Sequence, residues 1–163
     1  MQEKLESYRQ HQGIAAVIYF SLNDYRTRMG EDGSGKYRKR VHGSTDLYGN
    51  VKPSYSFLRD ALSPVVVESI SRETGGQLCR IRCRNDIPSY AVSGYQLIVC
   101  DKQTFTETVA AVPAMKPGQF VELSIPFVDA PKGKIRIEIH RSTGFRSIVQ
   151  EVEIFHEANS CNY

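Results

Sequence analysis

The sequence lacks any long apolar run. No stretch approaches the roughly 18 residues that a membrane-spanning helix needs. The N-terminal segment, MQEKLESYRQHQG, is polar and helical in character, so it does not have the pattern of a signal peptide. The sequence therefore predicts no membrane partner. It leaves the cellular compartment open, because a longer parent protein would carry its export signal elsewhere.

An excess of charge of one sign is also missing. Lys and Arg total 21 and Asp and Glu total 18, which gives a net charge of +3. So mild an excess does not indicate nucleic-acid binding without a patterned basic face. The basic run KYRKR, at 36–40, places one aromatic residue among four cations in a single loop. We therefore predict no nucleic-acid partner. The 40% hydrophobic content indicates a globular chain.

Cysteine is scarce and is not arranged for disulfides or metal. The four cysteines are Cys79, Cys83, Cys100 and Cys161. In the segment LCRIRCR, Cys79 and Cys83 alternate with arginines, which predicts two buried free thiols on one face of a core strand. A zinc site needs closely paired Cys or His, and no His lies near these two. Asp101 and Asp129 are isolated, so calcium has little support. We predict no metal and no cofactor.

The second half of the chain, 64–163, has the pattern of a β-sandwich. Short segments alternate apolar and polar residues, and turn residues recur between them. In GKIRIEIHR, for example, Ile135, Ile137 and Ile139 share one face. We predict strands near 65–71, 76–84, 94–101, 104–111, 118–125, 133–140 and 146–155. Seven such strands fit an immunoglobulin-like or fibronectin-like sandwich, so the predicted fold class is mainly β.

The first half, 1–63, follows a different pattern of helix, apolar strand, polar loop and helix. Residues 2–11 suggest the end of a helix that Gly13 stops, and 52–62 a helix with Pro53 in its first turn. Between them, 14–22 is apolar on both faces, which is typical of a strand in a covered parallel sheet. This order is that of a (β/α)8 barrel.

Polar residues follow the predicted strand directly, where barrels place their active sites. They are Asn23, Asp24, Tyr25 and Arg26. One strand and two helices cannot close a barrel, and an unpaired apolar strand invites edge pairing or aggregation. We therefore expect this chain to be the C-terminal portion of something larger, with an incomplete barrel segment at 1–63 and a sandwich at 64–163.

Residues 1–64 resemble the end of the catalytic barrel of glycoside hydrolase family 2, the β-galactosidases and β-glucuronidases. The motifs that carry the resemblance are NDYR, RVHG, DLYGN and KPSY. The resemblance implies that 14–22 is the eighth barrel strand and 53–62 the eighth helix. Family members commonly have a Trp near the end of that strand as part of the sugar-binding wall. This sequence has no tryptophan, and Phe20 stands at the matching position.

The family implies a retaining β-glycosidase of carbohydrate metabolism whose acid/base and nucleophile are two Glu residues. Both precede the eighth strand in the family, and neither Glu3, Glu6 nor Glu31 matches their motifs. We predict no catalytic residue and no hydrolysis by this chain alone. The Asn-x-Lys motif of the glucuronidase branch is absent from HGSTD, so the resemblance favours a galactosidase-like enzyme.

The predicted substrate-binding residues are five, and their predicted partners are an upstream catalytic barrel and a β-linked glycoside. These residues are Phe20, Asn23, Asp24, Arg26 and His42. Asp24 has an alternative structural role in an ion pair, Phe20 in core packing, and His42 in a hydrogen bond to a loop backbone. The sequence also allows a homo-oligomer.

Two other functions stay open for the sandwich. It is alternatively a stand-alone module that binds a glycan or a protein, with 1–63 as a vestigial arm. A purely structural sandwich that packs against the barrel is compatible with the glycosidase interpretation.

Overall fold

The computed structural model of the chain describes residues 2–27, 39–73, 76–126 and 133–154. Three residues named above, Glu31, Asp129 and Cys161, lie outside these ranges, as does the first part of the basic run at 36–38. The chain divides into two compact units, 1–62 and 63–163.

The described residues of the second unit form seven strands, and each overlaps a predicted one. They are β3 (Val65–Glu73), β4 (Gly76–Cys83), β5 (Tyr95–Asp101), β6 (Glu107–Val112), β7 (Phe120–Pro126), β8 (Gly133–His140) and β9 (Arg146–Ile154). All the described pairings between them are antiparallel. The alternation of apolar and polar residues identified these strands because successive side chains of a strand point to opposite faces.

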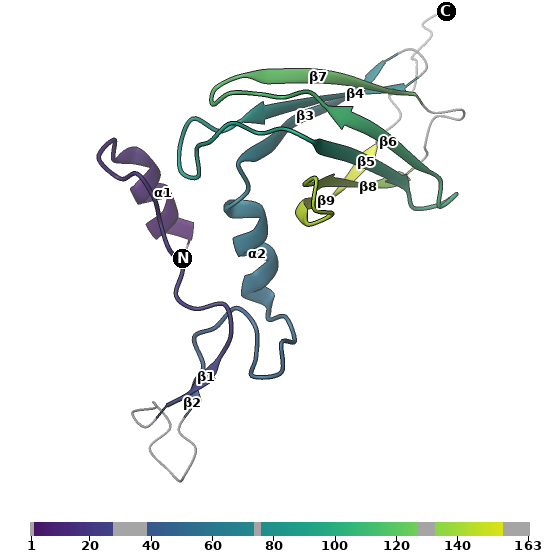
Figure 1. The fold of residues 1–163 in the computed structure, drawn as a ribbon. Coiled ribbons are helices and arrows are strands. Elements are labelled where there is room, and N and C mark those ends of the chain that lie inside the picture. The colour runs from purple at the N-terminus through teal and green to yellow at the C-terminus, as the bar shows by residue number, and fades with distance from the viewer. Residues whose placement is uncertain (1, 28–38, 74–75, 127–132, 155–163) are drawn as a thin grey trace, which may run out of the picture. The chain divides into compact units, whose positions relative to one another are not determined.

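The seven strands form two sheets, drawn as two layers in Figure 1. One sheet has the order β3-β4-β7 and the other the order β6-β5-β8-β9. The mainly β fold class is confirmed, and the arrangement is consistent with a β-sandwich.

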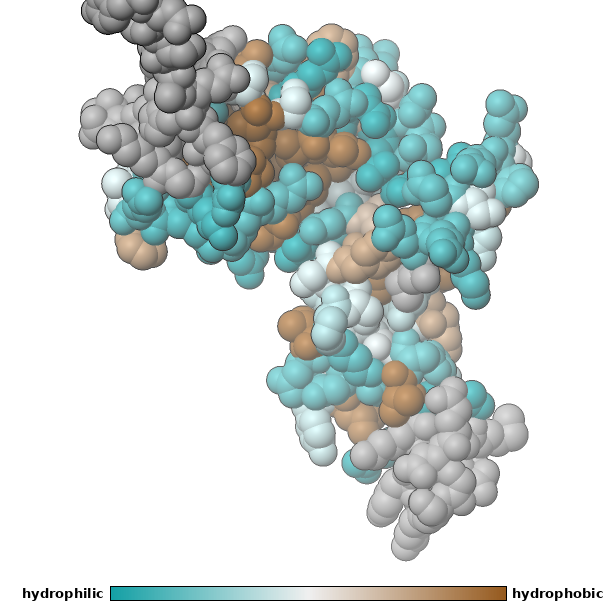
Figure 2. Space-filling model, turned by 180° about the vertical axis from the view of Figure 1, so that it is seen from behind, coloured by the Kyte–Doolittle hydropathy of each residue, from teal (hydrophilic) through white to brown (hydrophobic). Residues whose placement is uncertain are grey.

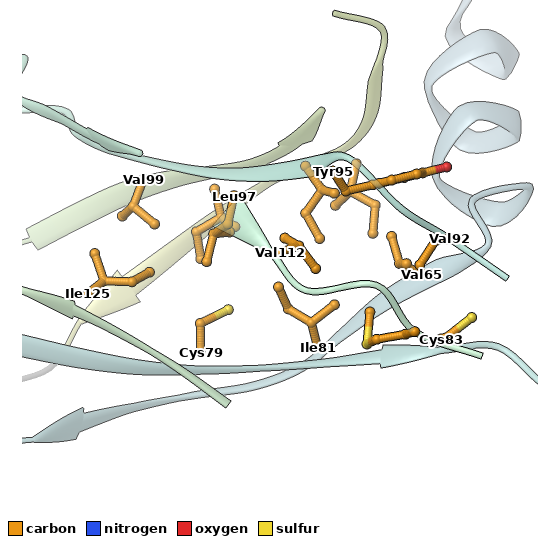
Figure 3. Packing of buried hydrophobic residues seen from close by; sticks show 14 of the residues in the cluster. Val65, Cys79, Ile81, Cys83, Val92, Tyr95, Leu97, Val99, Val112 and Ile125 are labelled. Atoms are coloured by element: carbon orange, nitrogen blue, oxygen red, sulfur yellow. The ribbon is translucent and has the colours of Figure 1, made fainter. Parts of the chain in front are cut away.

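One hydrophobic core lies between the two sheets. Figure 3 shows Cys79 and Ile81 of β4 pointing toward Leu97 and Val112 of the other sheet. The relative exposure of Cys79 is 1% and that of Ile81 and Cys83 is 0%. Cys79 and Cys83 are free thiols, as predicted, and burial raises the pKa of the Cys79 thiol to about 11. The core is therefore assembled from the inward residues of both sheets.

In the first unit, residues 2–27 and 39–62 form two helices and a short two-stranded ladder. The predicted helices are confirmed as α1 (Gln2–Gln10) and α2 (Pro53–Ala61). The loop between them contains β1 (Tyr25–Arg26) and β2 (Lys39–Arg40), which pair antiparallel. The Arg9 guanidinium, in the last turn of α1, donates a hydrogen bond to the Ala61 carbonyl at 2.6 Å. This bond satisfies one of the carbonyls left open at the end of α2.

No strand forms at the predicted position 14–22 in this structure, so the partial barrel is not confirmed. Within the described residues, 15–20 make no backbone–backbone hydrogen bond. Ile18 is 91% exposed, Phe20 69% and Leu22 63%. The apolar pattern was detected correctly, but a strand also needs a hydrogen-bonded neighbour, and none of the described residues provides one.

Candidate functional site

The polar residues that follow the apolar segment are held by a crossing of two backbone segments, 21–24 and 43–45. The Thr45 amide donates to the Leu22 carbonyl at 2.8 Å, and the Asp24 amide donates to the Thr45 carbonyl at 2.9 Å. The Ser44 amide donates to the Ser21 carbonyl at 3.3 Å. Hydrogen bonds in both directions thus connect the end of the apolar segment to Ser44 and Thr45, more than 20 residues later in the sequence.

Gly43 is the residue that allows this crossing. A Cβ atom at this position would lie 2.3 Å from the Asn23 carbonyl carbon and 2.3 Å from the Asp24 nitrogen. Real Cβ atoms do not approach backbone atoms so closely, so no larger residue fits without moving one of the two segments. The glycine of the RVHG motif is therefore explained by close backbone approach.

The Asp24 carboxylate lies inside the crossing. Its Oδ1 accepts a hydrogen bond from the Gly43 amide at 2.9 Å and an ion-paired one from Lys52 Nζ at 2.5 Å. The side chain of Asp24 is 9% exposed and that of Lys52 28%. Lys52 Nζ also donates to the Val41 carbonyl at 3.0 Å. Of the two roles that the sequence left open for Asp24, this geometry is that of the structural ion pair.

Asn23 has a similar role on the other side of the crossing. Its Oδ1 accepts a hydrogen bond from the Thr45 hydroxyl at 2.7 Å. The same hydroxyl lies 3.2 Å from the Leu22 carbonyl. Asn23 and Asp24 thus fix the path of the loop, and the Oδ1 atom of each accepts hydrogen bonds within the protein.

Three rings gather beside the crossing. The ring centroids of Phe20, Tyr25 and His42 are 5.8 Å (Phe20–Tyr25), 5.9 Å (Phe20–His42) and 5.6 Å (Tyr25–His42) apart. The two contacts of Tyr25 are edge-to-face. This arrangement is favourable for aromatic rings. The Tyr19 hydroxyl donates to the His42 carbonyl at 2.9 Å, which holds the His42 backbone beside the apolar segment. We call Phe20, Tyr25 and His42 the ring cluster.

The structure therefore brings together some of the five predicted site residues and separates others. Phe20 and His42 belong to the ring cluster. The side chains of Asn23 and Asp24 instead accept hydrogen bonds from the segment 43–45 of the crossing. Arg26 is an exposed residue of β1, and its backbone is paired with Lys39. Tyr25 completes the ring cluster although it was not among the five. Its place in the NDYR motif was the available signal.

Two further elements of the loop support the site. The Asp46 carboxylate accepts hydrogen bonds from the Tyr48 and Asn50 amides and from the Asn50 side chain, at 2.8–2.9 Å. The Asn50 side chain is the main cause of the lowered pKa of Asp46, and backbone amides of the same turn add to the effect.

Lys52, which the sequence did not single out, supplies the cation for Asp24. Its distance of 28 residues from Asp24 explains why no local pattern revealed the pair.

An apolar groove runs along the other side of the apolar segment. It has a volume of about 520 Å³ and is lined from α1, from residues 17–20 and from α2, including Leu5, Tyr8, Val17, Tyr19 and Leu58. Val17 and Tyr19 are partly buried, whereas the residues that alternate with them are exposed. Val17 and Tyr19 thus pack toward the helices, whereas Ile18 is 91% exposed and Phe20, which packs beside Tyr25 and His42, is still 69% exposed. Figure 2 shows hydrophobic side chains at the surface of the molecule among hydrophilic ones.

Neither a metal site nor a membrane span is found in the part of the chain that the structure describes. No group of three His, Cys, Asp or Glu side chains within these residues is placed to hold a metal ion. Neither described helix is long and apolar enough to cross a membrane. Comparison with protein-family models finds no match to this chain, and comparison with curated proteins finds none.

Proposed function

We propose that this chain is the C-terminal portion of a retaining, β-galactosidase-like glycosidase of the family 2 type. In this proposal the first unit supplies the eighth strand and helix of a (β/α)8 barrel and part of its sugar-binding wall. The two catalytic Glu residues belong to an upstream barrel segment, so this chain is inactive alone. The observation that carries the proposal is the uncovered apolar segment 14–22, which lies between two helices and ends in the ring cluster.

The exposure pattern of this segment supports a place inside a barrel. In a (β/α)8 barrel, a strand packs one face on the outer helices and turns the other toward the barrel interior. Residues 17–20 line the groove between α1 and α2; within them Val17 and Tyr19 are partly buried, whereas Ile18 is 91% exposed. Fully burying an Ile or Phe side chain stabilises a protein by about 1.5–3 kcal/mol. Pairing with neighbouring strands would therefore bury these side chains and stabilise the segment.

The ring cluster supports a sugar-binding role. Phe20 is 69% exposed, yet its position is fixed by two ring neighbours. An exposed ring in a fixed position offers a flat apolar face to the C–H groups of a pyranose. Asn23 and Asp24 position the loop that carries His42, while Arg26 stands on β1 beside the cluster. In this proposal Phe20 and His42 contact the sugar, and the other residues act through the loop.

The second unit is, in this proposal, an immunoglobulin-like or fibronectin-like accessory sandwich. Its support is the division of seven antiparallel strands into sheets of three and four, together with a single shared core. Its role would be structural within the larger enzyme.

The experiment that tests the proposal is reconstitution. This chain is mixed with a separately produced upstream barrel segment, encoded in frame 5′ of Met1, and hydrolysis of a chromogenic β-galactoside is measured. A β-glucuronide serves as the specificity control. We expect turnover only in the mixture. Phe20→Ala should raise the KM for the galactoside, and Tyr48→Ala, which removes an exposed aromatic residue outside the ring cluster, should have no effect. Absence of any glycosidase activity in a soluble complex would reject the proposal.

A stand-alone binding module is the second candidate. The observation that favours it is the core of the sandwich, which is built entirely from residues of 63–163. Expression of 64–163 alone and its retention on glycan affinity gels separate the two functions. Retention that needs no upstream segment would favour the binding module.

A further inference from the structure

We draw no further inference here: the strongest candidate, the side-chain cluster around the Glu138 carboxylate on the outer face of β8, carries nothing because this side chain is only 7% exposed and is already engaged, at 2.6–3.8 Å, by the basic side chains of Arg136, His140 and Arg146, so nothing among the described residues indicates a ligand that would reach it.

Discussion

At the scale of single residues, Gly43 is the described glycine of the first unit at which an added side chain would meet the closest backbone contacts. Gly43→Ala would place a Cβ 2.3 Å from two backbone atoms of the opposite segment. We expect this variant to destabilise the crossing by about 2–3 kcal/mol, because the clashing atoms belong to the backbone and cannot move away as a flexible side chain could. Amide hydrogen exchange at Asp24, Ser44 and Thr45 reports it directly, because these amides make the bonds of the crossing.

The control for this prediction is Gly13→Ala. A Cβ at Gly13 meets no atom within 4 Å, so the exchange of the same three amides should be unchanged. Equal effects of the two substitutions would mean that the crossing is looser than its hydrogen bonds imply.

Asp24 and Lys52 form the second residue-scale prediction. Asp24→Asn keeps the side-chain shape but leaves the Lys52 ammonium without its carboxylate. We expect a loss of about 1–2 kcal/mol, moderated because Lys52 is partly exposed. Asp24→Asn combined with Lys52→Met should cost less than the sum of the single substitutions. Additive costs in this double-mutant cycle, read by hydrogen exchange of the Gly43 amide, would show that the two groups do not interact.

At the scale of elements, the sheet of β3, β4 and β7 carries an acid-sensitive contact on its outer face. The pKa of Glu68 is lowered from 4.5, mainly by the hydrogen bond from Arg82 and further by the charges of Arg82 and Arg80, although burial opposes the shift. Because the folded pKa is depressed, this contact stabilises the fold above pH 4.5 and is lost as the pH falls through the folded value.

Glu68→Gln should therefore reduce the loss of stability on acidification. Urea denaturation is followed by circular dichroism between pH 7 and about pH 3, where ordinary carboxyl groups become protonated. We expect the variant to be less stable than the parent near neutral pH and to approach it at the acid end. Arg82→Gln breaks the same ion pair, so the stability of this variant should also depend less on pH over this range. Parallel curves for parent and variants would exclude a role for this contact.

The elements also show what a sequence can predict. The strands β4 and β8 were found because alternation of Cys79, Ile81 and Cys83, or of Ile135, Ile137 and Ile139, is a local pattern that one buried face requires. The segment 14–22 has an equally clear apolar pattern but forms no strand here, since a strand depends on hydrogen-bonded neighbours that a local pattern does not reveal.

The candidate site was predictable only in part, for a similar reason. The aromatic and polar residues after the apolar segment are adjacent in sequence, so Phe20, Asn23 and Asp24 were recognisable. Their partners Gly43, Thr45 and Lys52 come 19 to 28 residues later, in a loop without periodicity. Whether a carboxylate faces a ligand or a lysine depends on such long-range contacts, and these are absent from the local pattern.

At the scale of the whole molecule, the two units differ in how much apolar surface they bury. The second unit encloses an extensive core that both of its sheets share, whereas the buried hydrophobic residues described in the first unit are Leu5 and Leu58. Burial of apolar area is the main stabilising contribution to folding. We therefore expect the first unit to open far more readily than the second.

Hydrogen exchange on the full chain measures this difference and links it to the proposed function. Amides of 15–20, which lack backbone partners among the described residues, should exchange fastest, and those of β4, β5 and β8 slowest. If 14–22 is a barrel strand, adding the upstream segment should slow exchange at 15–20 by about tenfold or more, because each new ladder bond must open first. If glycosidase activity were restored while the amides of 15–20 still exchanged fast, the active barrel would close without this segment, and 14–22 would not be its eighth strand.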